Sequence, residues 1–179
     1  MIVLGVDPGS QITGFGFIEI DSDQERLVDC GVITLTSEPN QQLRLKMVYK
    51  ELSVLMSRHL PDSCAVEMPV YGNNPQSMLK LGRIQAAAML AALNLEIPVV
   101  QYTPKEVKKA VTGNGNASKE QVQYMVRSLL SIEESRVMGL DTSDALAVGL
   151  CHAQRNRSPD VSGPKSWSAF IRENPDRVL

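Results

Sequence analysis

Four acidic residues lie at the ends of otherwise apolar segments. Asp7 follows the run IVLGV, and Glu67 follows SCAV. Asp141 and Asp144 open the segment DTSDALAVGL, and their spacing of three residues places them on one face of a helix. Carboxylates beside an apolar core need compensation, and a divalent cation is the usual partner of several that converge. Their oxygens favour Mg²⁺ or Mn²⁺, and carboxylates that hold two such ions are typical of phosphoryl transfer.

The same acids also have a purely structural interpretation. An aspartate at the start of a helix often caps it, which would explain Asp141. An acid after a strand can form a turn, and Pro-Gly-Ser follows Asp7 directly. The two histidines, His59 and His152, have no metal-ligand spacing to a partner, so a metal here would be held by oxygen. Spacing alone leaves both interpretations open.

Basic residues are concentrated in the middle of the chain. Residues 71–130 carry seven bases against three acids, a net charge of +4, whereas the whole chain has a net charge of −2. The pattern indicates either a local anion-binding face or a set of solvated helix faces. The seven bases are Lys80, Arg83, Lys105, Lys108, Lys109, Lys119 and Arg127.

Apolar periodicity predicts a mixed α/β fold. The first three strands should form an antiparallel meander, and later strands should alternate with helices. Strands are predicted at 2–7, 13–20, 27–35, 63–67 and 97–103. Helices are predicted at 40–59, 75–93, from Pro104, from a capping box at Ser118 to about Leu130, and from about Asp141 to Gln154.

The 179 residues suit one domain with a tail, which we divide at 1–156 and 157–179. No apolar run is long enough to span a membrane, no signal peptide is visible, and the three cysteines have the context of reduced thiols. These features predict a cytoplasmic protein. In the tail, SPDVSGP is typical of a linker, and SWSAFIREN could form a short helix that docks on the body or binds a partner.

Four segments in order resemble the RuvC family of Holliday-junction resolvases. They are GVDPGSQITGFG, AVEMPVYGNNPQSMLKLG, VKKAVTGNGNASKEQVQYMVRSLL and DTSDALAVGLCH, and the match runs from about Val3 to His152. The resemblance implies a ribonuclease-H-like fold with a five-stranded sheet in the order 3-2-1-4-5. It also implies a homodimer that cuts four-way DNA junctions in recombination and repair, with two Mg²⁺ ions (Mn²⁺ as an alternative), leaving a 5′-phosphate. A branch-migration helicase complex of the RuvA and RuvB type is the implied partner.

The resemblance also assigns residues. The family's catalytic and metal-binding acids match Asp7, Glu67, Asp141 and Asp144, and its two DNA-binding lysines match Lys108 and Lys119. One departure is that the family's stacking aromatic matches Val70, whereas this chain has Tyr71 one residue later. We expect Tyr71, Lys80 and Arg83 as further DNA contacts, although a surface tyrosine and a solvated helix face explain them as well. The apolar helix 75–94 matches the family's subunit contact.

Two alternatives belong to other classes. Sugar kinases and actin-like ATPases share a similar opening hairpin, but they need a second related domain for which 179 residues leave no room. A ribonuclease-H-like protein that only binds nucleic acid, or cuts another substrate, is the second alternative. The intact set of four acids argues against a protein that only binds.

Overall fold

The fold is described from a computed structural model of the chain, for residues 1–21, 24–69, 74–133, 135 and 137–157. The central element is a five-stranded sheet in the order β3-β2-β1-β4-β5. β1 pairs antiparallel with β2 and parallel with β4, so it occupies the middle of the sheet. The predicted fold class and strand order are therefore confirmed. The strands are β1 (Ile2–Asp7), β2 (Ile12–Ile20), β3 (Glu25–Thr34), β4 (Ser63–Glu67) and β5 (Val99–Tyr102).

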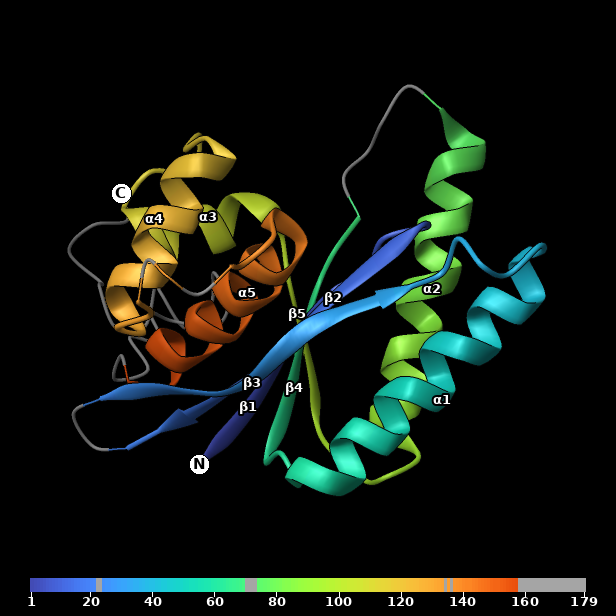
Figure 1. The fold of residues 1–179 in the computed structure, drawn as a ribbon, viewed down its shortest axis with the longest axis horizontal. Helices are drawn as coiled ribbons and strands as arrows, with labels where there is room; N and C mark the ends of the chain where they lie inside the picture. Colours follow the sequence, from blue (N-terminus) through green and yellow to red (C-terminus); the bar gives the residue numbers. More distant parts are fainter. Residues whose placement is uncertain (22–23, 70–73, 134, 136, 158–179) are drawn as a thin grey trace, which may run out of the picture.

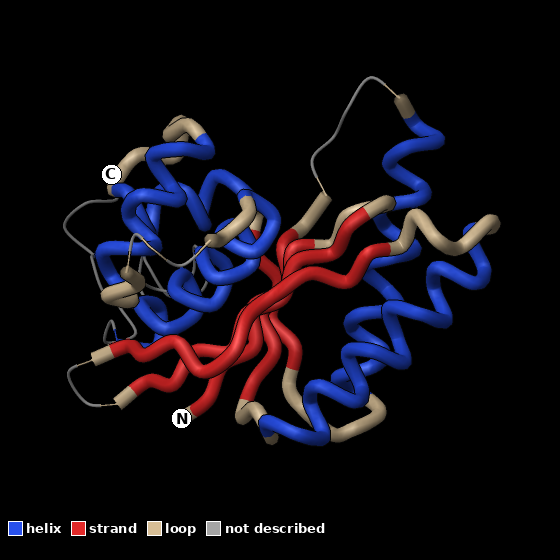
Figure 2. The backbone as a smooth tube through the Cα atoms, viewed as in Figure 1, coloured by secondary structure: helices blue, strands red, loops and turns tan. Residues whose placement is uncertain are grey.

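Two groups of helices cover the sheet, one on each face (Figures 1 and 2). On one face α1 (Gln41–His59) and α2 (Pro75–Leu93) close a core that includes Leu4, Val66 and Ile84. The other face carries α3 (Pro104–Thr112), α4 (Lys119–Leu129) and α5 (Leu140–Arg157), which enclose a second core. Alternate residues of the buried middle strand reach both cores, which is why β1 is almost wholly apolar up to Asp7.

Side-chain caps define where the helices begin. Asn40 and Asn74 accept from backbone N–H groups of α1 and α2, and Thr103 and Ser118 form complete capping boxes with Glu106 and Gln121. The predicted starts after Thr103 and Ser118 are thereby confirmed. α5 begins at Leu140, so Asp141 lies within the first helical turn and the cap interpretation of this residue was wrong.

Several ends of elements differ from the prediction, among them the start of β3 at Glu25 instead of residue 27, both ends of β5, and the end of α5. β5 is limited to Val99–Tyr102, because the Ile97 N–H bonds the carbonyl of Ala92 and belongs to the turn after α2. α5 continues past Gln154 to Arg157. The proposed tail helix with Trp167 lies outside the described residues. Within the part of the chain that the structure describes, no helix is both long and apolar enough to cross a membrane.

Glycines let α5 lie directly on the sheet. A Cβ on Gly14 would collide with the backbone carbonyl of Asp141, and one on Gly5 would collide with that of Ala145. Both glycines are therefore required by close approach of backbone to backbone. The consequence is that the first turn of α5, with its two aspartates, is held against β1 and β2.

Candidate active site

Asp7 and Glu67 come together because β1 and β4 are parallel. Val6 pairs with Val66, so the next residue of each strand is an acid at the same edge of the sheet. The two carboxyl groups interact directly, and this contact acts to raise the pKa of Glu67 and to lower that of Asp7. The apolar strand β1 thus ends in a carboxylate that lies beside the carboxylate at the end of β4.

α5 brings Asp144 to the same place. Asp144 accepts a hydrogen bond from Lys119 Nζ at 2.7 Å, and its side chain is only 15% exposed whereas that of Lys119 is 55% exposed. Lys119 is the first residue of α4, so the ammonium group extends from a helix end into the acidic site. Asp141 is half-buried in the same turn of α5 and contributes to the negative potential at Asp7.

Burial and mutual repulsion change how these groups titrate. Burial, together with the charge of Asp7, raises the pKa of Glu67 to about 9. Burial also raises the pKa of Asp7, although the hydrogen bond from Glu67 acts in the opposite direction. The hydrogen bond to Asp144 raises the pKa of Lys119. Near neutral pH, a proton on Glu67 and the Lys119 ammonium therefore compensate the site's negative charge.

The donor set suits a hard divalent cation, since it consists of carboxylate oxygens alone. Among the described residues, no group of three His, Cys, Asp or Glu side chains lies close enough together to hold a metal ion. The carboxyl groups have other partners instead, since Glu67 contacts Asp7 and Asp144 pairs with Lys119. Binding of a cation would therefore displace the proton from Glu67 and loosen the contact of Lys119 with Asp144.

A pocket of about 350 Å³ opens above these groups. Asp7, Glu67, Asp144, Lys108 and Lys119 line it on the polar side. Its remaining walls are apolar, and they come from the loops after β1 and β4 and from α2, α3 and α4. They comprise Pro8, Met68, Pro69, Leu81, Pro104, Val107 and Val122.

Lys108 also organises the loop between α3 and α4. Its Nζ donates to the carbonyl of Ala117 at 2.7 Å, just before the cap residue Ser118. An ammonium has three N–H donors, so one such bond leaves two for an anion in the pocket. The two predicted lysines thus line the same pocket as the acids, one from α3 and one from α4.

Of the other predicted DNA contacts, the two that the structure describes do not lie in this pocket. Lys80 and Arg83 are exposed on α2 and do not line the pocket, and Tyr71 lies outside the described residues. One supporting residue had not been predicted: Gln85 donates to the backbone carbonyl of Glu67 at 3.3 Å and to Gln101 at 3.0 Å. Its position one turn after Leu81 follows from helical spacing, but its partner on β4 could be known only from the fold.

Comparison with known proteins identifies the family. The model for "Crossover junction endodeoxyribonuclease RuvC" matches residues 3–152. The chain belongs to the RuvC family. A RuvC from Salinibacter ruber is 54% identical over 178 residues, which cover 99% of each chain. A solved structure of Thermus thermophilus RuvC in complex with Holliday junction substrate is 30% identical, with a TM-score of 0.81, and the match covers 88% of this chain and 95% of that one.

A more distant structure supports the fold alone. The yeast mitochondrial Holliday junction resolvase Ydc2 is 15% identical, with a TM-score of 0.64, over 85% of this chain and 77% of that one. Membership of the RuvC family makes this protein a nuclease of the ribonuclease-H-like class and excludes the sugar-kinase and ATPase alternative. The RuvC family consists of metal-dependent nucleases, in agreement with the all-oxygen donor set.

The raised pKa of Glu67 predicts how stability depends on pH. Between its ordinary pKa of 4.5 and about 9, the folded protein holds the Glu67 proton more tightly than the unfolded chain does. The free energy of unfolding of the metal-free protein should therefore fall as pH rises through this window. Thermal melts in a chelator should show a falling Tm, and Glu67→Gln should flatten the slope because its side chain stays neutral. Equal slopes for the two proteins would contradict the assignment.

Proposed function

We propose that this RuvC-family protein resolves four-way DNA junctions by hydrolysing phosphodiester bonds at the Asp7–Glu67 site, with Mg²⁺ as the ion and two ions per site. The observation that carries the proposal is the meeting of Asp7, Glu67, Asp144 and Lys119 in one pocket of a chain of this family. The junction complex of the Thermus thermophilus relative supports the same substrate. We propose the cytoplasm as its compartment and a helicase complex of the RuvA and RuvB type as its partner.

Each residue then has a separate task. The carboxylates of Asp7, Glu67, Asp141 and Asp144 would hold the ions. When bound, Mg²⁺ supplies Lewis-acid stabilisation of the charge that develops on the phosphate. Lys108 and Lys119, on the same polar side of the pocket, bind phosphate oxygens, and Lys119 exchanges its contact with Asp144 for one with the substrate. Exclusion of water by the apolar walls strengthens these electrostatic contacts.

Hydrolysis of the bond to the 3′ oxygen leaves a 5′-phosphate and a 3′-hydroxyl, so the nicked arms can be sealed by a ligase. The substrate assignment is tested by incubating the protein and Mg²⁺ with a synthetic four-way junction and with a linear duplex of the same sequence. We expect paired symmetric nicks in the junction that a ligase can seal, and at most slow nicking of the duplex. Equal cleavage of both would favour a ribonuclease-H-like nuclease with another substrate.

Paired nicks need two like sites, which a two-fold homodimer supplies. Three leucines on α2, Leu79, Leu90 and Leu93, are 56%, 53% and 51% exposed. Leu79 and Leu90 are eleven residues apart and thus on one helical face, with Leu93 beside them. This exposed apolar face, in the helix that the family resemblance assigns to the subunit contact, supports a homodimer through α2. Ala88 of the same helix is fully buried in the protein's own core, so only part of the apolar surface of α2 is available for a subunit contact.

The dimer proposal makes a direct prediction. Leu90→Arg should convert the protein to a monomer in sedimentation experiments, because it places a charge in the middle of the apolar contact. The monomer should nick junctions singly rather than in pairs. Val54→Arg is the matched control, since Val54 is a 48% exposed apolar residue on α1 that lines a groove with Val32 of β3. A Leu90→Arg protein that stays dimeric would exclude this face as the interface.

A further inference from the structure

A second pocket lies away from the proposed active site. It has a volume of about 700 Å³ and lies between the start of β3 and the end of α4. Ile2 pairs with Glu19 and Asp7 with Gly14, so the hairpin end of β2 and β3 is at the opposite end of the sheet from Asp7. Nothing in the proposed hydrolysis uses this pocket.

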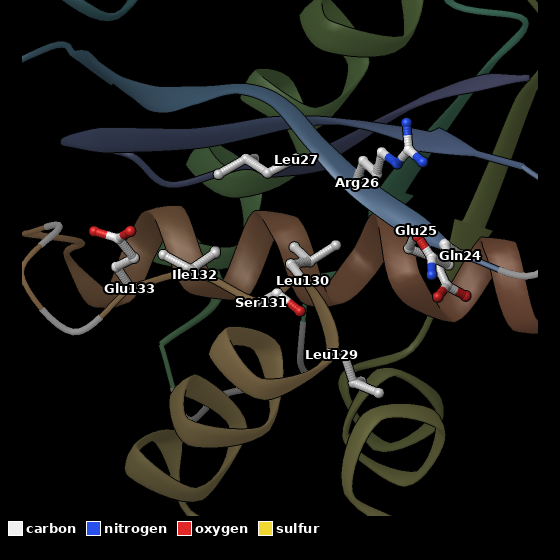
Figure 3. A pocket seen from close by; sticks show the side chains of 9 residues that line it. All are labelled: Gln24, Glu25, Arg26, Leu27, Leu129, Leu130, Ser131, Ile132 and Glu133. Carbon is white, nitrogen blue, oxygen red and sulfur yellow. The ribbon is translucent and has the colours of Figure 1, made fainter.

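An apolar row between two carboxylates forms its lining. Figure 3 shows Leu27 of β3 facing Leu130 and Ile132, with Glu25 and Glu133 at opposite ends of the row. Leu27, Leu130 and Ile132 also contact the second hydrophobic core, so their positions are fixed by packing. The C-terminal end of α4 adds further negative potential here. The exposed Arg26 is the cationic residue among the pocket's lining residues.

The last helix ends beside this pocket. Leu146 of α5 lies against Gly16, and Gly149 lies against Ile18, so α5 runs in the same direction as β2. The eight further residues to Arg157 extend the helix by about 12 Å, which is level with the hairpin turn after Ile20. Figure 1 shows the same arrangement, with the end of α5 near the β2–β3 hairpin. The end of α5 at Arg157, which residues 158–179 follow in the sequence, is therefore close to the pocket.

The tail sequence has a complementary pattern. Lys165 and Arg172 flank Trp167, Phe170 and Ile171, and the segment KSWSAFIR contains no acid. The three apolar residues have the i, i+3, i+4 spacing of one helical face. Trp167 is ten positions after Arg157, and this length of chain can span at most about 35 Å. Similarity to the Salinibacter ruber relative extends through this tail, since it covers 99% of both chains.

We propose that residues 165–172 of the tail dock intramolecularly into this pocket. The apolar side chains cover the half-buried Leu27 and Ile132, which lie beside the buried Leu130, and the two flanking cations pair with Glu25 and Glu133. The docked tail closes the second hydrophobic core at the hairpin end. This inference does not depend on the proposed nuclease reaction, because the pocket and the catalytic pocket share no residue.

The experiment uses the fluorescence of Trp167, which is the sole tryptophan of the chain. In the full-length protein its emission should be shifted to the blue, and quenched less by acrylamide, than in a synthetic peptide of residues 158–179. Ile132→Glu places a carboxylate in the middle of the row and should return the emission to that of the peptide. Val54→Glu, in the separate groove between α1 and β3, should leave the emission unchanged.

A second pair of variants does not touch the body of the protein. Lys165→Glu combined with Arg172→Glu should shift the emission to the red and lower the Tm by about 5 °C, whereas Arg177→Glu outside the segment should do neither. Peptide-like emission from the wild-type protein would overturn the proposal. So would a blue shift that responds to Val54→Glu instead of Ile132→Glu. A blue shift lost on dilution would show docking on a second copy, which also contradicts an intramolecular contact.

Discussion

The Asp7→Asn protein should cleave a four-way junction on the order of 10³-fold more slowly than the wild type in Mg²⁺. Asp7 is the acid on the middle strand and shares a hydrogen bond with Glu67, so its loss affects every ion bound at this edge. Junction binding should be kept or slightly improved, because one fewer negative charge faces the DNA. Single-turnover cleavage and gel-shift binding measure the two effects separately.

Glu19→Gln is the matched control for this change. Glu19 is an exposed acid on the neighbouring strand β2, at the other end of the sheet. The variant alters the net charge of the protein by the same amount and should cleave at the wild-type rate. Wild-type cleavage by Asp7→Asn would show that the carboxylates at the ends of β1 and β4 are not the active site.

Lys119→Ala should slow cleavage on the order of 10²-fold even at saturating enzyme, which is the effect of a lost transition-state donor. Lys119 reaches the site from the first turn of α4, where the helix N-terminus also favours phosphate. The variant should also flatten the salt dependence of junction affinity by about one unit of slope, as expected for one phosphate contact. Lys109→Ala, an exposed lysine on α3, is the control and should retain the wild-type rate at saturation.

The contact between Lys119 and Asp144 is also consistent with a role of Lys119 in the metal-free protein alone. If Lys119 only neutralises Asp144 in the metal-free protein, its removal should tighten metal binding and leave the saturated rate unchanged. Lys119 would then be a residue that holds the metal-free site together. Wild-type single-turnover rates for Lys119→Ala would therefore remove it from the proposed reaction.

Much of this fold is evident in local patterns. The apolar run to Asp7, the capping boxes at Thr103 and Ser118, and the apolar helix from Pro75 are all found in the structure as predicted. These features depend on neighbouring residues, so periodicity and capping chemistry reveal them. The strand order 3-2-1-4-5 was supplied by the family resemblance, because the pairing of β1 with β4 joins segments far apart in the sequence.

The details of the site could not be predicted in the same way. The hydrogen bond of Glu67 to Asp7, the ion pair of Lys119 with Asp144 and the support from Gln85 each join different elements. They depend on the register of β1 with β4 and on the close approach of α5 that Gly14 permits. The burial of Ala88 was likewise not evident from the sequence. Because α2 is apolar around much of its circumference, the sequence does not show which face packs against the sheet.

Binding of Mn²⁺, followed by its electron paramagnetic resonance signal, tests most directly whether these carboxylates form a metal site. The wild-type protein should bind the ion, with affinity that rises with pH as the Glu67 proton is displaced, and Mg²⁺ should compete for the same site. Asp7→Asn should lose this binding, and Glu19→Gln should keep it. Undiminished Mn²⁺ binding by the Asp7→Asn protein would contradict the account, because the ion would then be held elsewhere.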